Sequence, residues 1–322
     1  MKYEPQNASA APRFTGIRTF MRLPFIKTTE DVDFAIVGIP FDTGGSYRSG
    51  QRFGPARIRE NSTMLRPRSF NLGVNIFDYL SGIDYGDVPC VPGNIADTYR
   101  LIEETLKPLV ENDIFPLCFG GDHSITLGEL RAIAKQHGPV CLIHFDSHQD
   151  MDDAYWTDIV DGGVKYNHGT PFRRAIDEGL IDPEHSIQIG IRGTDYDDSD
   201  IRMSTDQGIR VITANELHEI GTKEACEIIK QTVGDRKAFL TFDVDFLDPA
   251  FAPGTGTIEI GGFSTYEAVQ LIMGMKEIRF VGCDIVEVLP DLDHSNITCW
   301  AAASIAHEVI SVIALQKKQG LR

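Results

Sequence analysis

Short apolar runs alternate along this chain with segments of helical periodicity. The runs are rich in β-branched and aromatic residues and span 33–39, 114–119, 139–145, 186–191, 209–214, 238–244 and 278–286. The helical segments span 94–112, 125–137, 170–180, 222–234, 264–277 and 297–318. Strands that are apolar on both faces and alternate with helices are typical of a parallel sheet between two helical layers. The pattern therefore predicts an α/β fold with a mainly parallel central sheet.

We predict one folded unit because no linker, repeat or low-complexity segment interrupts this alternation. The catalytic domain is expected over 33–322, with 1–32 as an N-terminal extension that is part of the same domain. A chain of 322 residues with 42% hydrophobic and 24% charged residues can bury a large core.

The charge balance excludes some classes of partner. A formal charge of -17 argues against nucleic acid, whose phosphates require clustered Lys and Arg, but not against a small cationic substrate. No segment approaches the ~18 uninterrupted apolar residues of a membrane span, and the first residues lack a secretory apolar stretch. We expect a cytoplasmic protein without a membrane partner. Its scattered cysteines, expected to be reduced, are Cys90, Cys118, Cys141, Cys226, Cys283 and Cys299.

Polar residues gather where the predicted strands end. The strand at 114–119 leads into GGDHS, the one at 139–145 into DSHQD, and the one at 238–244 into DVDFLDP, while Glu287 follows the strand at 278–286. Ligands of open α/β sheets bind at the carboxyl ends of the strands. These residues are therefore expected to converge.

Side chains at the first three of these strand ends form a candidate metal-binding set. Its members are His123, Asp146, His148, Asp150, Asp243 and Asp245. Crowded carboxylates repel one another and are costly to bury, so they require compensating positive charge. The set exceeds the four ligands of one zinc ion and suits two harder divalent ions that share carboxylates. Each motif alone has a simpler interpretation, such as a helix cap at Asp122 or Ser124, but their joint occurrence favours the metal site.

Several segments resemble those of the ureohydrolases, the family of arginase and agmatinase. These are GGDHS, LIHFDSHQD and TFDVDFLDPAFAPGTGTIEIGG, followed by DIVEV, and the resemblance extends from the segment at 37–60 to the final helix. It implies a three-layer α/β/α domain with two Mn²⁺ ions, for which Ni²⁺ or Co²⁺ are alternatives.

The resemblance also implies a ligand set for each ion. The first ion would be held by His123, Asp146, Asp150 and Asp243, and the second by Asp146, His148, Asp243 and Asp245. Asp146 and Asp243 would bridge the two ions. His144 matches no family ligand, although strand alternation alone would include it, so we assign it a structural role. Ser147 stands where many members have Ala, and it is a small residue that the family tolerates, while Ile258 stands where Pro is usual and touches no ligand.

The family chemistry implies a catalytic role for three side chains. A hydroxide formed at the ions would attack the guanidinium carbon, and urea and an amine would leave. Asp150 would orient that hydroxide, His168 in YNHGTPF would relay a proton to the amine, and Glu287 would pair with the guanidinium. Without the resemblance, His168 would be interpreted as structural and Glu287 as a loop carboxylate.

The expected substrate is a small linear guanidino compound, with agmatine ranked first. The loop at 151–167 contains four Asp and one Lys, which favours a cationic or neutral substrate tail. The alternatives are 4-guanidinobutyrate and then 3-guanidinopropionate, guanidine or a related compound. A guanidino acid would require a cation for its carboxylate, such as Arg173, Arg174 or an arginine of SYRSGQR.

Two further expectations concern partners. The family implies a homo-oligomer, a trimer or a hexamer. A catalytically silent relative that acts through protein interaction is the alternative from another functional class, and its signature would be a lost ligand. All six candidate ligands are present.

Overall fold

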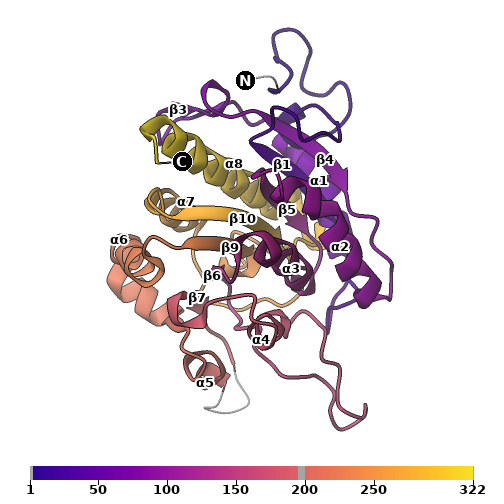
Figure 1. Ribbon diagram of the computed structural model, residues 1–322, viewed down its shortest axis with the longest axis vertical. Coiled ribbons are helices and arrows are strands. Elements are labelled where there is room, and N and C mark those ends of the chain that lie inside the picture. Colours follow the sequence, from indigo (N-terminus) through magenta and orange to yellow (C-terminus); the bar gives the residue numbers. More distant parts are fainter. Residues whose placement is uncertain (1–2, 195–199, 322) are drawn as a thin grey trace.

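The computed structural model describes residues 3–194 and 200–321. Its centre is an eight-stranded sheet in the order β4-β1-β5-β10-β9-β6-β7-β8 (Figure 1). All neighbouring strands in this sheet pair in parallel. Its strands are β1 (Phe34–Ile39), β4 (Gly82–Asp87), β5 (Phe115–Gly120), β6 (Cys141–Phe145), β7 (Ile187–Ile191), β8 (Arg210–Thr213), β9 (Lys237–Asp243) and β10 (Arg279–Val286).

Helices cover both faces of this sheet. They are α1 (Gly54–Ser62), α2 (Ile95–Val110), α3 (Thr126–His137), α4 (Pro171–Asp177), α5 (Asp200–Thr205), α6 (Ala214–Val233), α7 (Thr265–Gly274) and α8 (Ile297–Gln319). Successive strand residues point to opposite faces, so Phe34 and Ile36 enter one apolar cluster while Ala35 and Val37 enter another. The first cluster includes residues of α1, α6, α7 and α8, and the second includes residues of α2, α3 and α4. The predicted three-layer α/β/α fold is confirmed.

Several elements were not predicted from the apolar pattern. The strand β4 reads GIDYGD and lies at the sheet edge, where one neighbour and a partly polar sequence give no continuous apolar run. The helix α1 is short and polar, and a small antiparallel pair, β2 (Arg68–Ser69) and β3 (Val74–Asn75), also lacks an apolar run. The helix α6 begins before the predicted segment and has a break at Gly221, whose φ is 75°.

The segment that ends in α8 is long and apolar enough to span a membrane by length and composition alone. In this fold, however, 83% of its most apolar window is buried inside the protein. A helix that is hydrophobic on all sides and buried in this way is typical of a protein core.

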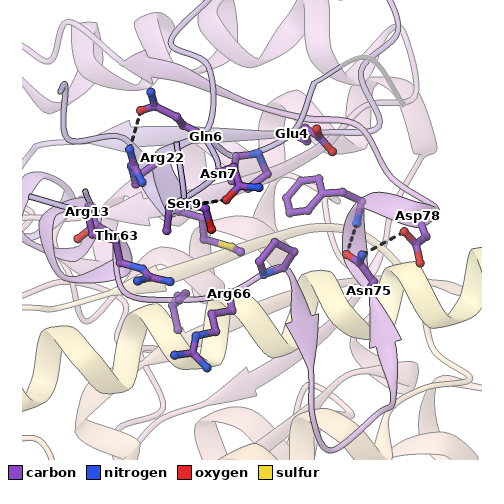
Figure 2. A pocket seen from close by; sticks show the side chains of 16 residues that line it. Glu4, Gln6, Asn7, Ser9, Arg13, Arg22, Thr63, Arg66, Asn75 and Asp78 are labelled. Atoms are coloured by element: carbon purple, nitrogen blue, oxygen red, sulfur yellow. Dashed lines mark hydrogen bonds between the residues drawn. The ribbon is translucent and has the colours of Figure 1, made fainter. Parts of the chain in front are cut away.

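The N-terminal segment lies against the edge of the sheet. Phe20, Met21 and Leu23 join the first apolar cluster, and the backbone N–H of Phe20 donates to Asp84 of β4 at 2.9 Å. Residues of the segment at 4–22 and of the segment at 63–78 line a cavity of about 370 Å³ (Figure 2). These contacts agree with an N-terminal extension that is part of one domain, although the domain boundaries themselves stay a prediction.

Gly121 allows the ends of three strands to approach one another. A Cβ atom at this position would lie 2.0 Å from the carbonyl oxygen of Phe41 and 2.8 Å from that of Ile39. The carbonyl oxygen of Gly121 also accepts the backbone N–H of Glu287 at 2.9 Å, which links β5 to β10. Only a residue without a side chain fits between these backbones.

We expect Gly121→Ala to lower the free energy of unfolding by about 1–3 kcal/mol, because the added methyl group must displace backbone. The measurement is the midpoint of chemical denaturation. Gly45→Ala is the control, since its added carbon comes no closer than 3.3 Å to a carbonyl oxygen, that of Arg48. Equal midpoints for the two variants would contradict this account of Gly121.

Candidate metal centre and active site

Four neighbouring strands in the middle of the sheet end at the candidate site. They are β5, β10, β9 and β6, in that spatial order. Val286 of β10 pairs with Asp243 of β9, so Glu287 begins directly beside the end of β9. Parallel strands bring their carboxyl ends to one edge of the sheet, and the predicted residues meet there.

The imidazole of His123 lies at the centre of the first group of donor atoms. Its Nδ1 is 3.0 Å from Oδ2 of Asp146, 2.9 Å from Oδ2 of Asp150 and 3.4 Å from Oδ2 of Asp243. None of these contacts has the geometry of a hydrogen bond, and this buried Nδ1 has no hydrogen-bond partner among the described residues. Donor atoms of His123, His144, Asp146 and Asp150 all lie within 4.8 Å of one another.

The second group surrounds His148. Its Nδ1 lies 3.0 Å from Oδ2 of Asp245 and 3.5 Å from Oδ1 of Asp146. Oδ2 of Asp245 is buried and has no hydrogen-bond partner within the described part of the chain. Asp146 therefore has one carboxylate oxygen near each of the two histidines, although its Oδ1 also accepts the backbone N–H of His148 at 2.6 Å, so its bridging role stays a prediction.

The spacing and chemistry of these atoms fit two divalent ions. Donor atoms on an octahedral ion with bonds of ~2.1 Å lie roughly 3 Å apart, which is close to the separations observed around both histidines. Carboxylate oxygen and imidazole nitrogen are the ligands of ions such as Mn²⁺, Ni²⁺ and Co²⁺. The His and Asp residues thus form a cluster suitable for a binuclear metal site.

Asp243 approaches His123 with Oδ2, while its Oδ1 accepts the backbone N–H of Asp245 at 2.8 Å, so a bridging role of Asp243 stays a prediction.

His144 lies in the first compact group, with Nε2 at 2.7 Å from Oδ2 of Asp146. Its Nδ1 accepts from Nε2 of Gln188 at 3.0 Å, so Nε2 carries the proton and donates to Asp146. Both ring nitrogens are therefore engaged, which favours the structural role.

The electrostatics of the cluster reflect its shortage of positive charge. Burial raises the pKa of Asp243 well above its usual range, and the charges of Asp245 and Asp146 raise it further. Burial alone would raise the pKa of Asp146 too, but three neighbouring histidines hold it well below the usual range. Burial would lower the pKa of His123, yet its contacts with Asp146, Asp150 and Asp243 raise it well above the ordinary value. Bound cations would replace the protons that these groups otherwise require.

A buried hydrogen-bond partner orients the first imidazole. Nε2 of His123 lies 2.8 Å from Oγ1 of Thr241 on β9. A separate hydrogen bond links the hydroxyl group of Thr126 to Oδ2 of Asp284 on β10 at 2.6 Å. Metal-binding histidines commonly use the second ring nitrogen in this way, which fixes the tautomer and ring orientation. Thr241 was not among the predicted site residues. Its position two residues before Asp243, on the same face of the strand, is the signal that could have identified it.

His168 and Glu287 form a pair beside the metal groups. Nδ1 of His168 lies 3.2 Å from Oε1 of Glu287, and Nε2 of His168 lies 2.7 Å from Oγ of Ser46. Burial would lower the pKa of His168, but the hydrogen bond to Glu287 and its charge outweigh burial and raise this pKa to about 9. The backbone N–H of Ser46, at 3.1 Å from Nε2, opposes this shift because it can only donate. Ser46 was not among the predicted site residues.

Two of the predicted catalytic residues have unusual backbone conformations. Asp150 has a φ of 54° and Glu287 a φ of 65°, in the left-handed region that non-glycine residues seldom occupy. Such residues concentrate at functional sites, where the surrounding structure determines their conformation.

A cavity of about 580 Å³ opens onto the site. Its walls include Asp150, Asp243 and Glu287 at the base and Tyr155 and Trp156 from the loop at 151–167. This size and position suit a small molecule that reaches both the metal groups and the His168–Glu287 pair.

The arginines expected to meet a substrate carboxylate do not line this cavity. Arg173 pairs with Asp177, Arg174 pairs with Asp153 and Asp177, Arg52 pairs with Asp42, and Arg48 lies over the ring of Tyr47. The arginine that does line it, Arg192, donates to the backbone carbonyl groups of Gly190, Asp245, Phe246, Leu247 and Glu259.

Comparisons with known proteins agree with this geometry. The model of the arginase family matches residues 32–311. The chain is 41% identical to a guanidinobutyrase of Pseudomonas aeruginosa, with 97% of each chain covered. It is 42% identical to a mitochondrial agmatinase of Gallus gallus, over 96% of this chain and 89% of that one. The solved structure of proclavaminate amidino hydrolase from Streptomyces clavuligerus is similar with a TM-score of 0.89 and 38% identity, over 94% of this chain and 99% of that one.

The family match covers most of the chain, and the relatives match it nearly end to end. The fold, the cluster of His and Asp residues and these similarities agree, so the chain belongs to the arginase family of ureohydrolases, in the branch of the agmatinases and guanidinobutyrases, and is an amidinohydrolase.

Proposed function

We propose that this enzyme hydrolyses the guanidino group of a small linear guanidino compound to urea and an amine, and that its substrate is agmatine. The observation that carries the proposed reaction is the pair of donor groups that share Asp146 beside a carboxylate able to bind a guanidinium. The finer choice of agmatine rests on the chemistry of the cavity.

The proposed ligand set is the one expected from the sequence. His123, Asp146, Asp150 and Asp243 would hold one ion, and Asp146, His148, Asp243 and Asp245 would hold the other, with Mn²⁺ as the proposed metal and Ni²⁺ or Co²⁺ as alternatives. Two such ions, when bound, supply a hydroxide nucleophile at neutral pH. The Asp150 carboxylate lies in the first group, with Oδ2 at 2.9 Å from Nδ1 of His123, and would orient the nucleophile by accepting a hydrogen bond from it.

His168 and Glu287 act on the substrate. The Glu287 carboxylate binds the guanidinium through charge-assisted hydrogen bonds and holds its carbon over the metal groups. The His168 imidazole, whose Nδ1 contacts Glu287, gives a proton to the leaving amine, which cannot depart as an anion. Its Nε2 contact with the Ser46 hydroxyl provides a path by which the proton is replaced.

The lining of the cavity supports a substrate with a cationic tail. Asp152 and the aromatic rings of Tyr155 and Trp156 line it, and carboxylates and aromatic faces both attract an ammonium group. Among the described residues that line the cavity, Arg192 is the sole arginine or lysine, and its guanidinium is already occupied by backbone carbonyl groups. A carboxylate tail would therefore have to rely on neutral donors.

4-Guanidinobutyrate is the second candidate substrate. It is supported by the similarity to a guanidinobutyrase, which is 41% identical to this chain, against 42% for an agmatinase.

We further propose a cytoplasmic homo-oligomer, a trimer or a hexamer, that has neither nucleic acid nor membrane as a partner. Its six free cysteines support a reducing compartment.

Asp146→Ala should abolish both metal retention and turnover, because this carboxylate contributes an oxygen to each donor group. The measurement is the metal content per chain after gel filtration, together with urea release. Asp158→Ala, on the exposed part of the loop at 151–167, is the control and should retain both. Unchanged metal content in Asp146→Ala would rule out the proposed ligand set.

The raised pKa of His168 predicts a pH-dependent stability. A histidine whose pKa rises from 6.5 to about 9 on folding stabilises the fold fully below pH 6.5 and loses this contribution as the pH rises through 9. We expect the wild-type protein to lose on the order of 2–3 kcal/mol more stability than His168→Gln between pH 6 and pH 9.5.

Thermal unfolding at a series of pH values, with both proteins in the same metal state, measures this difference. His294→Gln replaces an exposed histidine and should follow the wild type. Parallel curves for the wild type and His168→Gln would show that Glu287 does not stabilise the imidazolium.

A urea-release assay with added Mn²⁺ or Ni²⁺ tests the proposed substrate. The panel is agmatine, 4-guanidinobutyrate, 3-guanidinopropionate, arginine and guanidine, and we expect the highest kcat/KM for agmatine. Higher kcat/KM for 4-guanidinobutyrate would reverse the ranking. Absence of urea from every compound would favour a catalytically silent relative.

A further inference from the structure

The side chain of Gln51 contacts the carboxylate proposed to bind the guanidinium. Its Nε2 donates to Oε2 of Glu287 at 2.7 Å and to the backbone carbonyl oxygen of Arg48 at 3.2 Å. Because both partners are acceptors, the NH₂ end of the amide must face them, which fixes the orientation of the amide. The residue is 1% exposed and does not line the substrate cavity.

Gln51 is the donor that reaches the Oε2 side of Glu287. Oε1 of Glu287 instead accepts from the backbone N–H of His123 at 2.8 Å and from Nδ1 of His168 at 3.2 Å. In the described part of the chain, the contact from Gln51 is the one hydrogen bond to Oε2. Without it, the carboxylate would be held from one side alone.

Packing does not account for a glutamine at this position. Its Oε1 is buried and has no hydrogen-bond partner among the described residues, which is a cost that an apolar side chain of equal length would avoid. A glutamine at this position is explained if the site requires its NH₂ group as a hydrogen-bond donor to Glu287.

The segment that carries Gln51 is itself held in place. The Asp42 carboxylate accepts the backbone N–H of Gly50 at 2.9 Å and Nε of Arg52 at 2.6 Å, so hydrogen bonds flank Gln51 on both sides. The same segment contributes Ser46, which contacts His168. One loop thus supports both members of the His168–Glu287 pair.

We propose that Gln51 is a positioning residue that sets the orientation of the Glu287 carboxylate for the substrate guanidinium. A guanidinium is a planar fork that binds a carboxylate best when the two planes coincide, so rotation of the carboxylate weakens the pairing. Each carboxylate oxygen has two acceptor sites, so the Gln51 contact leaves Oε2 able to accept from the substrate as well. This inference rests on the proposed function.

The test compares Gln51→Met with a matched variant, Gln316→Met. Gln316 is 4% exposed, and its Nε2 also donates to two acceptors, the carbonyl oxygens of Lys276 and Ile278, at the end of α8 away from the site. Both variants lose the buried hydrogen bonds of an amide side chain, but only Gln51→Met loses a hydrogen bond to Glu287. Gln51→Asn, which is one methylene shorter, serves as a second variant with a polar side chain.

The readouts are KM and kcat for the best substrate of the panel, together with metal content and the midpoint of thermal unfolding. For Gln51→Met we expect kcat/KM to fall by about 10- to 100-fold, with a raised KM and unchanged metal content, because a hydrogen bond to a charged group is lost. Gln51→Asn should show a KM between those of Gln51→Met and the wild type. Gln316→Met should lower the unfolding midpoint and leave KM unchanged.

The outcomes separate this inference from the proposed function. A smaller fraction of folded enzyme lowers the apparent kcat but leaves KM as it is, so an unchanged KM in both Gln51 variants would overturn the positioning role. A wild-type protein that releases no urea from any compound would overturn the proposed function, and the role of Gln51 with it.

Discussion

Repulsion among buried carboxylates is the constraint on which this site depends. Four aspartates at the carboxyl ends of β6 and β9 each place an oxygen 2.9 to 3.4 Å from an imidazole nitrogen, and their burial beside an apolar sheet would be unfavourable without counter-charge. The neighbouring histidines cannot balance the charge of all four carboxylates, whereas two divalent cations would. The sheet order brings β5, β10, β9 and β6 together, so the fold places the carboxylates close to one another, and bound cations would make this arrangement favourable.

Much of the fold and of the site could be predicted from the sequence, for identifiable reasons. Long apolar runs identified seven of the eight strands in the main sheet, and the spacing of polar residues at their ends identified the residues that converge. The edge strand β4 was missed because Asp84 and its glycines interrupt the apolar pattern, although Asp84 is buried against Arg59. An ion pair between distant residues leaves no periodic signal in the sequence.

The supporting residues were harder to predict than the ligands. Thr241, Gln188, Ser46 and Gln51 contact His123, His144, His168 and Glu287 respectively, across large separations in sequence. None of these four residues belongs to a motif whose chemistry requires a hydroxyl or an amide. Such side chains occur in many loops without a function, so they give no distinctive signal in the sequence. For His144, strand alternation alone would have predicted a metal ligand. Its Nδ1 instead accepts from Gln188, so its Nε2 carries the proton and donates to Asp146.

The left-handed backbone at Asp150 and Glu287 limits how these positions can change over time. Valine, isoleucine and threonine have two substituents on Cβ and are strongly disfavoured in this conformation. Asparagine and glycine tolerate it, but neither carries a negative charge. Neutral drift at both positions is therefore confined to few residue types, and a lineage that loses either acid can retain its fold without the carboxylate that we propose for the reaction.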